Sequence, residues 1–283
     1  MKHKLMWLML LLLPLSGCGI ISLGYNYADA YLRYSINSYV SYNDQQKDTI
    51  HREVDAYMAW HRATMLPKYA AFLQEVQRTA QSGAPLSKDA VAHFRAEVRD
   101  LYVQTLQPTI KPAAKLLSTL NEAQIDELVK SFAKEINKQK AKELSGNAEE
   151  QLRKRTERSV DFLENLVGGF NDSQLEKIRV MNRNLPFATP LYIMQREDYQ
   201  AHLLEVLKDK QGEAAIAGVL DAWLHTPEKF RNAADQSLVL AFEQGSDEMI
   251  ANVYQLLTER QRKTLLKNIE KYINTFQDLV NSK

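Results

Sequence analysis

Four short segments of the chain share one pattern, which constrains the fold more than any other feature of the sequence. Each segment has an Asn or Thr, an acid directly after it, and a Gln three positions after the Asn or Thr. The paired positions are Asn43 and Gln46, Asn121 and Gln124, Asn171 and Gln174, and Thr258 and Gln261. In a capping box these two side chains accept hydrogen bonds from backbone amides at a helix start. The pattern therefore predicts four helix starts.

The spacing and composition favour an all-α fold. The four starts are unevenly spaced, so a stacked-repeat solenoid is not expected. Glycine and proline number 10 and 8 in 283 residues, about half of their usual share of roughly 12%, which argues against a turn-rich β fold. Apolar residues make up 45% of the chain, enough for a large core. We therefore expect a multi-helix bundle.

Hydrophobic spacing predicts helices in most of the remaining chain. Residues 44–79 fit one helix, but Pro67 predicts a kink or break near Met65, because proline lacks an amide donor and clashes with the preceding turn. Ser87 is a predicted N-cap, and residues 237–242 are predicted to be helical. The apolar seam of the last helix is Leu265, Ile269, Tyr272, Phe276 and Leu279.

The chain begins with the parts of a secretory signal. Lys2 and Lys4 come before an apolar run over residues 5–15, which is shorter than the ~20 residues of a membrane-spanning helix. Leu15, Ser16 and Gly17 then lead to Cys18, the only cysteine. This segment resembles the lipobox of bacterial lipoprotein precursors. The resemblance implies cleavage before Cys18 and covalent acyl chains on it, with no other cofactor; a free thiol or an ordinary signal peptide is the alternative.

These features predict the domain organisation and the location. Residues 1–17 are a lipoprotein signal peptide, residues 18–43 a lipidated N-terminus with a tyrosine-rich tether or short helix, and residues 44–283 an α-helical domain. An alternative has two lobes joined near residues 137–158, a charge-mixed run that is typical of a solvated helix or a connection. By resemblance to lipoprotein sorting, Gly19 favours the periplasmic face of the outer membrane over the inner membrane.

Two stripes follow the predicted lipidation site. Tyr27, Tyr31 and Tyr34 share one side of a short helix, and Leu32, Ile36 and Tyr39 form a neighbouring stripe. The tyrosines are interpreted as covering the base of the helical body. Headgroup contact is the alternative, because tyrosine rings are favoured at a membrane interface.

Two resemblances add to this interpretation. The segment Leu257-Thr258-x-x-Gln261 resembles the LTxxQ motif of small periplasmic proteins that include ATP-independent chaperones, and Asn121 to Gln124 differs from it by one substitution. The whole chain resembles a family of uncharacterised Gram-negative outer-membrane lipoproteins. The marks of that family are the lipobox, Leu23-Gly24-Tyr25-Asn26, Trp60-His61-Arg62, Leu66-Pro67-x-Tyr69 and the closing Leu257 to Arg262.

The sequence has no recognisable catalytic or metal motif. His51 with Asp55, and His93 with Glu97, are interpreted as surface ion pairs, because a helix-borne metal site would need a second histidine. The chain has a net charge of +1, which gives no footprint for nucleic acid. We therefore expect no enzyme but a lipid-anchored, periplasm-facing protein with a binding or scaffold role, whose partner is an envelope protein. A chaperone for unfolded clients and an enzyme acting on envelope polymers are the alternatives.

Overall fold

The computed structural model describes residues 18–282, and within them the regular structure is helical. The lipobox residues Leu15, Ser16 and Gly17 lie outside the described residues. The helices are α2 (Cys18–Asn26), α3 (Ala28–Asn37), α4 (Asp44–Gln81), α5 (Lys88–Leu106), α6 (Ile110–Leu117), α7 (Glu122–Glu143), α8 (Ala148–Val167), α9 (Asp172–Asn184), α10 (Thr189–Lys208), α11 (Glu213–His225), α12 (Ala233–Leu256) and α13 (Glu259–Asn281), with short 3-10 turns η1 (Gln107–Thr109) and η2 (Pro227–Phe230). The predicted all-α bundle is confirmed.

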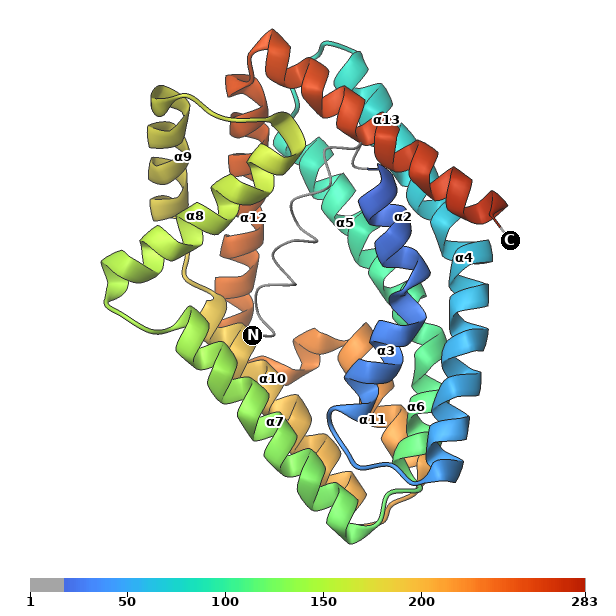
Figure 1. The fold of residues 1–283 in the computed structure, drawn as a ribbon. Coiled ribbons are helices and arrows are strands. Elements are labelled where there is room, and N and C mark those ends of the chain that lie inside the picture. The colour runs from blue at the N-terminus through green and yellow to red at the C-terminus, as the bar shows by residue number, and fades with distance from the viewer. Residues whose placement is uncertain (1–17, 283) are drawn as a thin grey trace, which may run out of the picture.

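The helices in the second half of the chain pack against the helices of the first half in reverse order. Helix α4 packs along α13, α5 along α12, α6 along α11, α7 along α10, and α8 along α9. Figure 1 shows α7 beside α10 and α4 beside α13, with the chain reversing at α8 and α9. Every helix from α4 to α8 therefore packs against a helix from the other half of the chain.

The sequence predicted a kink or a break near Met65. Helix α4 runs without a break through Pro67, so the break is wrong, and the kink stays a prediction. Met65 and Leu66, directly before the proline, are fully buried, and Ala70 beyond it packs against Ile269 and Ile273 of α13. Burial on both sides of Pro67 holds the helix together, although the proline removes one backbone hydrogen bond. The helix predicted for residues 237–242 is confirmed within α12, and Ser87 caps α5.

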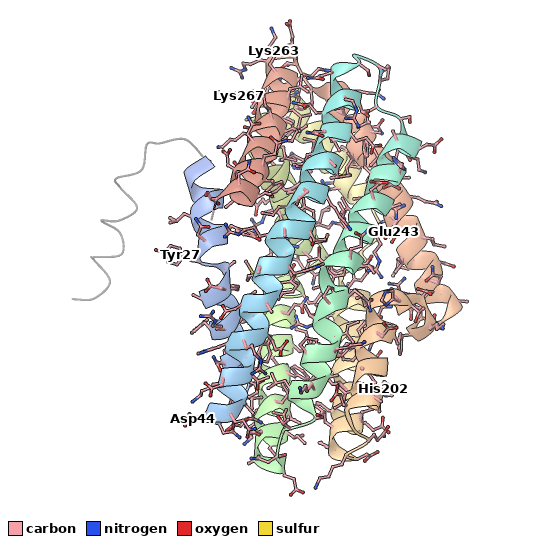
Figure 2. The ribbon with its side chains drawn as sticks, turned by 90° about the vertical axis from the view of Figure 1, so that its right-hand side faces the viewer. Tyr27, Asp44, His202, Glu243, Lys263 and Lys267 are labelled. Carbon is pink, nitrogen blue, oxygen red and sulfur yellow. The ribbon has the colours of Figure 1, made fainter. Side chains whose placement is uncertain are left out.

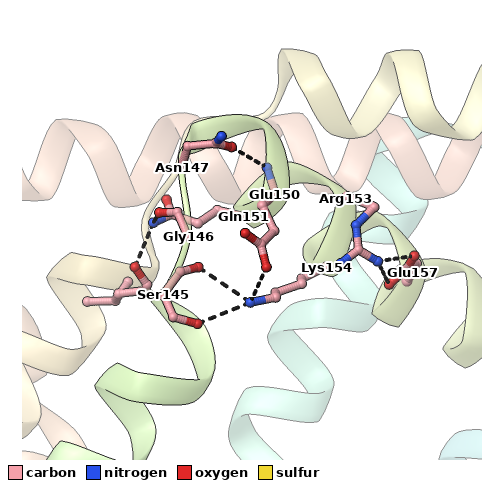
Figure 3. A network of polar contacts seen from close by, with 9 residues as sticks. Ser145, Gly146, Asn147, Glu150, Gln151, Arg153, Lys154 and Glu157 are labelled. Atoms are coloured by element: carbon pink, nitrogen blue, oxygen red, sulfur yellow. Dashed lines mark hydrogen bonds and ion pairs between the residues drawn. The ribbon is translucent and has the colours of Figure 1, made fainter.

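The charge-mixed run forms the end of α7, a short connection and the start of α8. Asn147 caps α8, and Gln151 and Lys154 donate hydrogen bonds back to the connection at Leu144 and Ser145 (Figure 3). Gly146 has a φ of +88°, and a Cβ there would collide with the Glu150 carboxylate. Because the Glu150 side chain can move aside, the positive φ is the reason that glycine is favoured at this position.

The stripes of the N-terminal segment point in opposite directions. Leu32, Ile36 and Tyr39 pack against the main core cluster, which is built around Ile50, Val54, Ile125, Leu203, Leu207 and Ile216. Tyr27, Tyr31 and Tyr34 are instead 64%, 68% and 72% exposed. The expectation that these three tyrosines cover the body is therefore wrong: the more apolar stripe takes that place. In the part of the chain that is described, no helix combines the length and apolarity needed to cross a bilayer.

Candidate functional site

The four predicted caps all form, and they interlock in two pairs that we call clasps. In the first clasp, the Gln46 and Gln124 amides face each other, and each Nε2 donates to the other Oε1, at 3.2 and 2.7 Å. Each Oε1 also accepts the backbone amide of its own cap residue, Asn43 at 3.0 Å and Asn121 at 3.1 Å. The side chains that begin α4 and α7 are thus bound directly to each other.

The second clasp repeats this arrangement between α9 and α13. Gln174 and Gln261 exchange Nε2 to Oε1 hydrogen bonds of 2.9 and 3.2 Å, and their Oε1 atoms accept the amides of Asn171 and Thr258. Asp44, directly after the first cap, and Lys263, near the second, lie at opposite ends of the molecule in Figure 2. The two clasps therefore close the two ends of the bundle.

The side-chain amide of each glutamine makes a third hydrogen bond, and its acceptor has the same sequence position relative to the partner's cap in all four cases. The Nε2 atom donates to the carbonyl two residues before the partner's cap: Gln46 to Thr119, Gln124 to Ser41, Gln174 to Leu256, and Gln261 to Gly169. The four glutamines are 3–6% exposed. Since a buried amide must have its donors and acceptors paired, these residues are fully used within the fold.

Several residues of the segments Leu23 to Asn26, Trp60 to Arg62 and Leu66 to Tyr69 come together where α2 meets the body. The Tyr25 hydroxyl lies 2.9 Å from His61 Nδ1, and His61 Nε2 lies 3.2 Å from the Tyr69 hydroxyl. The Tyr69 hydroxyl is also hydrogen-bonded to Thr105 Oγ1, and the Tyr57 hydroxyl donates to the Thr105 carbonyl at 3.3 Å. This chain of contacts links α2, α4 and α5, and we call it the N-terminal junction.

Arg62 strengthens the N-terminal junction from a second direction. Its guanidinium lies over the Tyr25 ring, 5.2 Å from the centroid, and donates to Asn26 Oδ1 at 3.3 Å. It also donates to the carbonyls of Leu279 and Ser282 at the end of α13. One side chain of α4 therefore holds both the N-terminal helix and the C-terminal helix.

Burial lowers the pKa of His61 below its ordinary value of 6.5, because desolvation penalises the charged ring. The folded junction thus prefers neutral histidine. Its contribution to stability is present above about pH 6.5 and decreases as the pH falls below that value. We expect the His61 ring to titrate below pH 6.5 by NMR. We also expect the protection factors of the α2 backbone amides, which are corrected for the slower intrinsic exchange at low pH, to be smaller at about pH 5 than at about pH 7. A His61 pKa at or above 6.5 would contradict this prediction.

Burial also raises the pKa of Tyr57 to about 12, with smaller contributions from Tyr69 and Tyr25. The pKa of Tyr25 is raised by burial too, against the opposing charge of Arg62. Both hydroxyls therefore stay protonated at neutral pH and are available as hydrogen-bond donors.

The histidine pairs differ from the sequence prediction. Asp55 pairs with Arg33 of α3 rather than with His51, and His93 Nε2 lies 3.1 Å from Glu75 Oε1 of α4. Ligand atoms of Glu75, His93 and Glu97 lie within 4.8 Å of one another, so these three side chains have the spacing of a possible cation site. Sequence could not show this, because Glu75 comes from a different helix.

Sequence reasoning also missed a cavity between α5, α6, α10 and α11. Its volume is about 470 Å³, and its lining residues include Arg99, Arg196, Arg231, Tyr199 and Trp223. Trp223 packs against the main core cluster and also forms part of this cavity wall. The residues come from α5, α10, α11 and the connection after η2, so no single local pattern in the sequence marks them as a group.

A family model matches residues 38–233 of the chain, and its description is "Family of unknown function (DUF6279)". The chain matches none of the curated proteins and none of the solved structures with which it was compared. The match begins after α3, so it includes the first clasp and His61 but not Tyr25 or Cys18. It ends before α13.

Proposed function

We propose that this chain, which belongs to the DUF6279 family of unknown function, is a lipid-anchored, non-enzymatic binding protein of the cell envelope. The observation that carries the proposal is a row of exposed apolar side chains directly after Cys18. Leu23, Tyr27, Tyr31 and Tyr34 are 54–72% exposed and follow one another at helical spacing on α2 and α3. We call them the tyrosine row.

The geometry of α2 and α3 supports a surface-lying orientation. Backbone hydrogen bonds continue from Tyr27 to Leu23 and from Tyr31 to Tyr27, so the two helices form a nearly continuous rod. At ~1.5 Å per residue, the row ends about 24 Å from Cys18. Tyr27 projects away from the other helices in Figure 2, while the opposite side of the rod packs on the body. Acyl chains at Cys18 and the tyrosine row then face the same membrane.

The N-terminal junction helps to fix the rod formed by α2 and α3 against the helical body. Hydrogen bonds of Tyr25 and Arg62 fasten α2 to α4, and an Arg33–Asp55 ion pair fastens α3 to the same helix. A rod that is fastened along its length holds the body close to the membrane, in contrast to a flexible tether. We propose that this membrane is the outer membrane and that the protein lies on its periplasmic face. We also propose that the bound partner is an envelope component.

The chaperone alternative rests on the LTxxQ-like segments, and no observation favours it. The glutamines of all four segments are buried in the clasps, where their hydrogen bonds are made within the fold. Suppression of aggregation of an unfolded client by the purified protein would support the alternative.

The membrane-facing role of the tyrosine row predicts a loss of vesicle binding. In a Cys18→Ser protein without acyl chains, replacing Tyr27, Tyr31 and Tyr34 by serine should weaken binding to phospholipid vesicles by roughly tenfold or more. The reason is the loss of three exposed rings that the proposed orientation buries partly in the membrane. Vesicle co-sedimentation measures the effect. The matched control replaces Phe162, Val180 and Leu240, which are similarly exposed on α8, α9 and α12, by serine.

The control variant should bind vesicles as well as its Cys18→Ser parent does. Equal binding by the tyrosine variant and its parent would contradict the proposed orientation. An equal loss of vesicle binding by the control variant would show that exposed apolar residues anywhere on the surface, and not the tyrosine row, cause the binding.

A further inference from the structure

The cavity between α5, α6, α10 and α11 has an unusual set of charges in its wall. Arg99, Arg196 and Arg231 all line it, and the lining residues include no acid. In residues 18–282 none of these three arginines lies within 4.0 Å of a carboxylate oxygen, although many other cations of the chain form ion pairs. Asp198 and Glu228 act on Tyr199 from outside the lining. The wall itself is therefore cationic.

The three guanidinium groups are held in place by neutral acceptors. Arg99 donates to the Leu224 carbonyl at 2.6 Å, Arg196 to Gln139 Oε1 at 3.0 Å, and Arg231 to Gln236 Oε1 at 3.3 Å. A neutral acceptor fixes the position of a guanidinium without neutralising its charge. Each arginine has further N–H groups in a planar fork that suits a carboxylate or a phosphate.

The same wall holds donors without a protein acceptor. Gln195 Nε2, Trp223 Nε1 and Arg231 Nε are buried and have no hydrogen-bond partner in the described chain. Unpaired buried donors are destabilising and rare in folded proteins. All three donors belong to residues that line the cavity, and the N–H groups themselves are covered by surrounding protein atoms.

Aromatic rings supply an apolar surface in the cavity. The rings of Tyr199 and Trp223 lie 5.3 Å apart at an angle of 31°, and Phe230 meets Tyr199 edge-on at 5.0 Å. The Tyr199 hydroxyl is hydrogen-bonded to the Pro227 carbonyl at 3.3 Å, which fixes the ring. Such a rigid pair suits the apolar face of a ring-shaped ligand.

From these contacts we propose that the cavity binds a small anionic sugar, that is, a sugar ring with a carboxylate or phosphate group. The anionic group is bound by the arginines, and the ring packs on Tyr199 and Trp223. A volume of about 470 Å³ accommodates one such molecule. The site is separate from the tyrosine row, so it does not depend on the membrane role.

Calorimetry on the full chain in detergent micelles tests the site with four probes: glucose 6-phosphate, glucuronate, glucose and inorganic phosphate. We expect saturable binding of at least one anionic sugar, and much weaker binding of glucose and of inorganic phosphate. Binding of glucose 6-phosphate would indicate a phosphate ligand, and binding of glucuronate would indicate a carboxylate ligand. Absence of binding by both anionic sugars overturns the proposal, and so does equal binding of glucose or of inorganic phosphate.

Two variants connect the binding to the cavity. Arg231→Gln should weaken binding of the anionic sugar by about 10- to 100-fold, because a charged hydrogen-bond donor is lost. Arg196→Gln removes the charge of a second arginine that lines the cavity, so it provides an independent test if Arg231→Gln does not fold. Arg52→Gln, at an exposed position on α4, is the control and should bind normally. Unchanged binding by both folded cavity variants would refute the assignment.

Discussion

Replacing Gln46 by methionine is expected to lower the free energy of unfolding by about 3 kcal/mol, because several buried hydrogen bonds are lost and their partners stay unpaired. Methionine has a similar length and volume, so packing changes little. The Asn43 amide loses its acceptor, and Gln124 loses both its donor and its acceptor in the clasp. The midpoint of thermal unfolding, measured by far-ultraviolet circular dichroism, should fall by roughly 2–3 °C for each kcal/mol.

The neighbouring residue provides a matched control. Gln45 is exposed and precedes Gln46 on the same helix, so Gln45→Met should change stability by less than ~0.5 kcal/mol. An effect of the same small size for Gln46→Met would contradict a stabilising role of the clasp.

A double-mutant cycle tests whether the glutamines act as pairs. Gln46→Met combined with Gln124→Met should cost less than the sum of the single changes, because the second substitution removes a group that the first one left unpaired. Gln46→Met combined with Gln174→Met, from different clasps, should be additive. Additivity within a clasp would show that the two side chains do not depend on each other.

The helix starts were predictable from sequence because a capping box is local. Asn121 and Gln124 are three residues apart, and their hydrogen bonds form whenever that segment begins a helix. The pairing of Gln46 with Gln124 was not predictable, because it depends on how α4 and α7 meet. The same limit applies to the reverse-order pairing of the two halves of the chain.

Two local expectations failed where tertiary packing decided the outcome. Pro67 lies between the buried residues Leu66 and Ala70, and packing against α13 outweighs the missing hydrogen bond. For the N-terminal helix, spacing identified two stripes but could not say which one meets the body. The stripe with Leu32 and Ile36 buries more apolar surface, so the tyrosines stay exposed.

The two candidate sites also differ in how much of each could be recognised from the sequence. Tyr25, His61, Arg62 and Tyr69 lie in sequence segments that carried a resemblance, and the structure brings them into one junction. The arginine and aromatic cavity left no sequence signal, since its wall is assembled from four helices. Sites of this kind require the tertiary arrangement before they can be recognised.

The second large effect is expected at Cys18. Each buried CH₂ of an acyl chain contributes about 0.8 kcal/mol to membrane binding, so two or three chains hold a protein effectively permanently. Cys18→Ala removes the sulfur that would be acylated, while α2 begins at the same position. We therefore expect nearly complete loss of stable anchoring, far beyond the change caused by the tyrosine row.

Fractionation of cells combined with mass measurement of the intact protein tests the account most directly. The account predicts that the wild-type chain is found with membranes, at a mass that lacks residues 1–17 and includes acyl chains. The Cys18→Ala chain should lack the acyl mass and the acyl-dependent processing, and a processed form should leave the membrane on washing with salt. A Cys18→Ala chain that stays with membranes at the processed mass of the wild type would contradict the account.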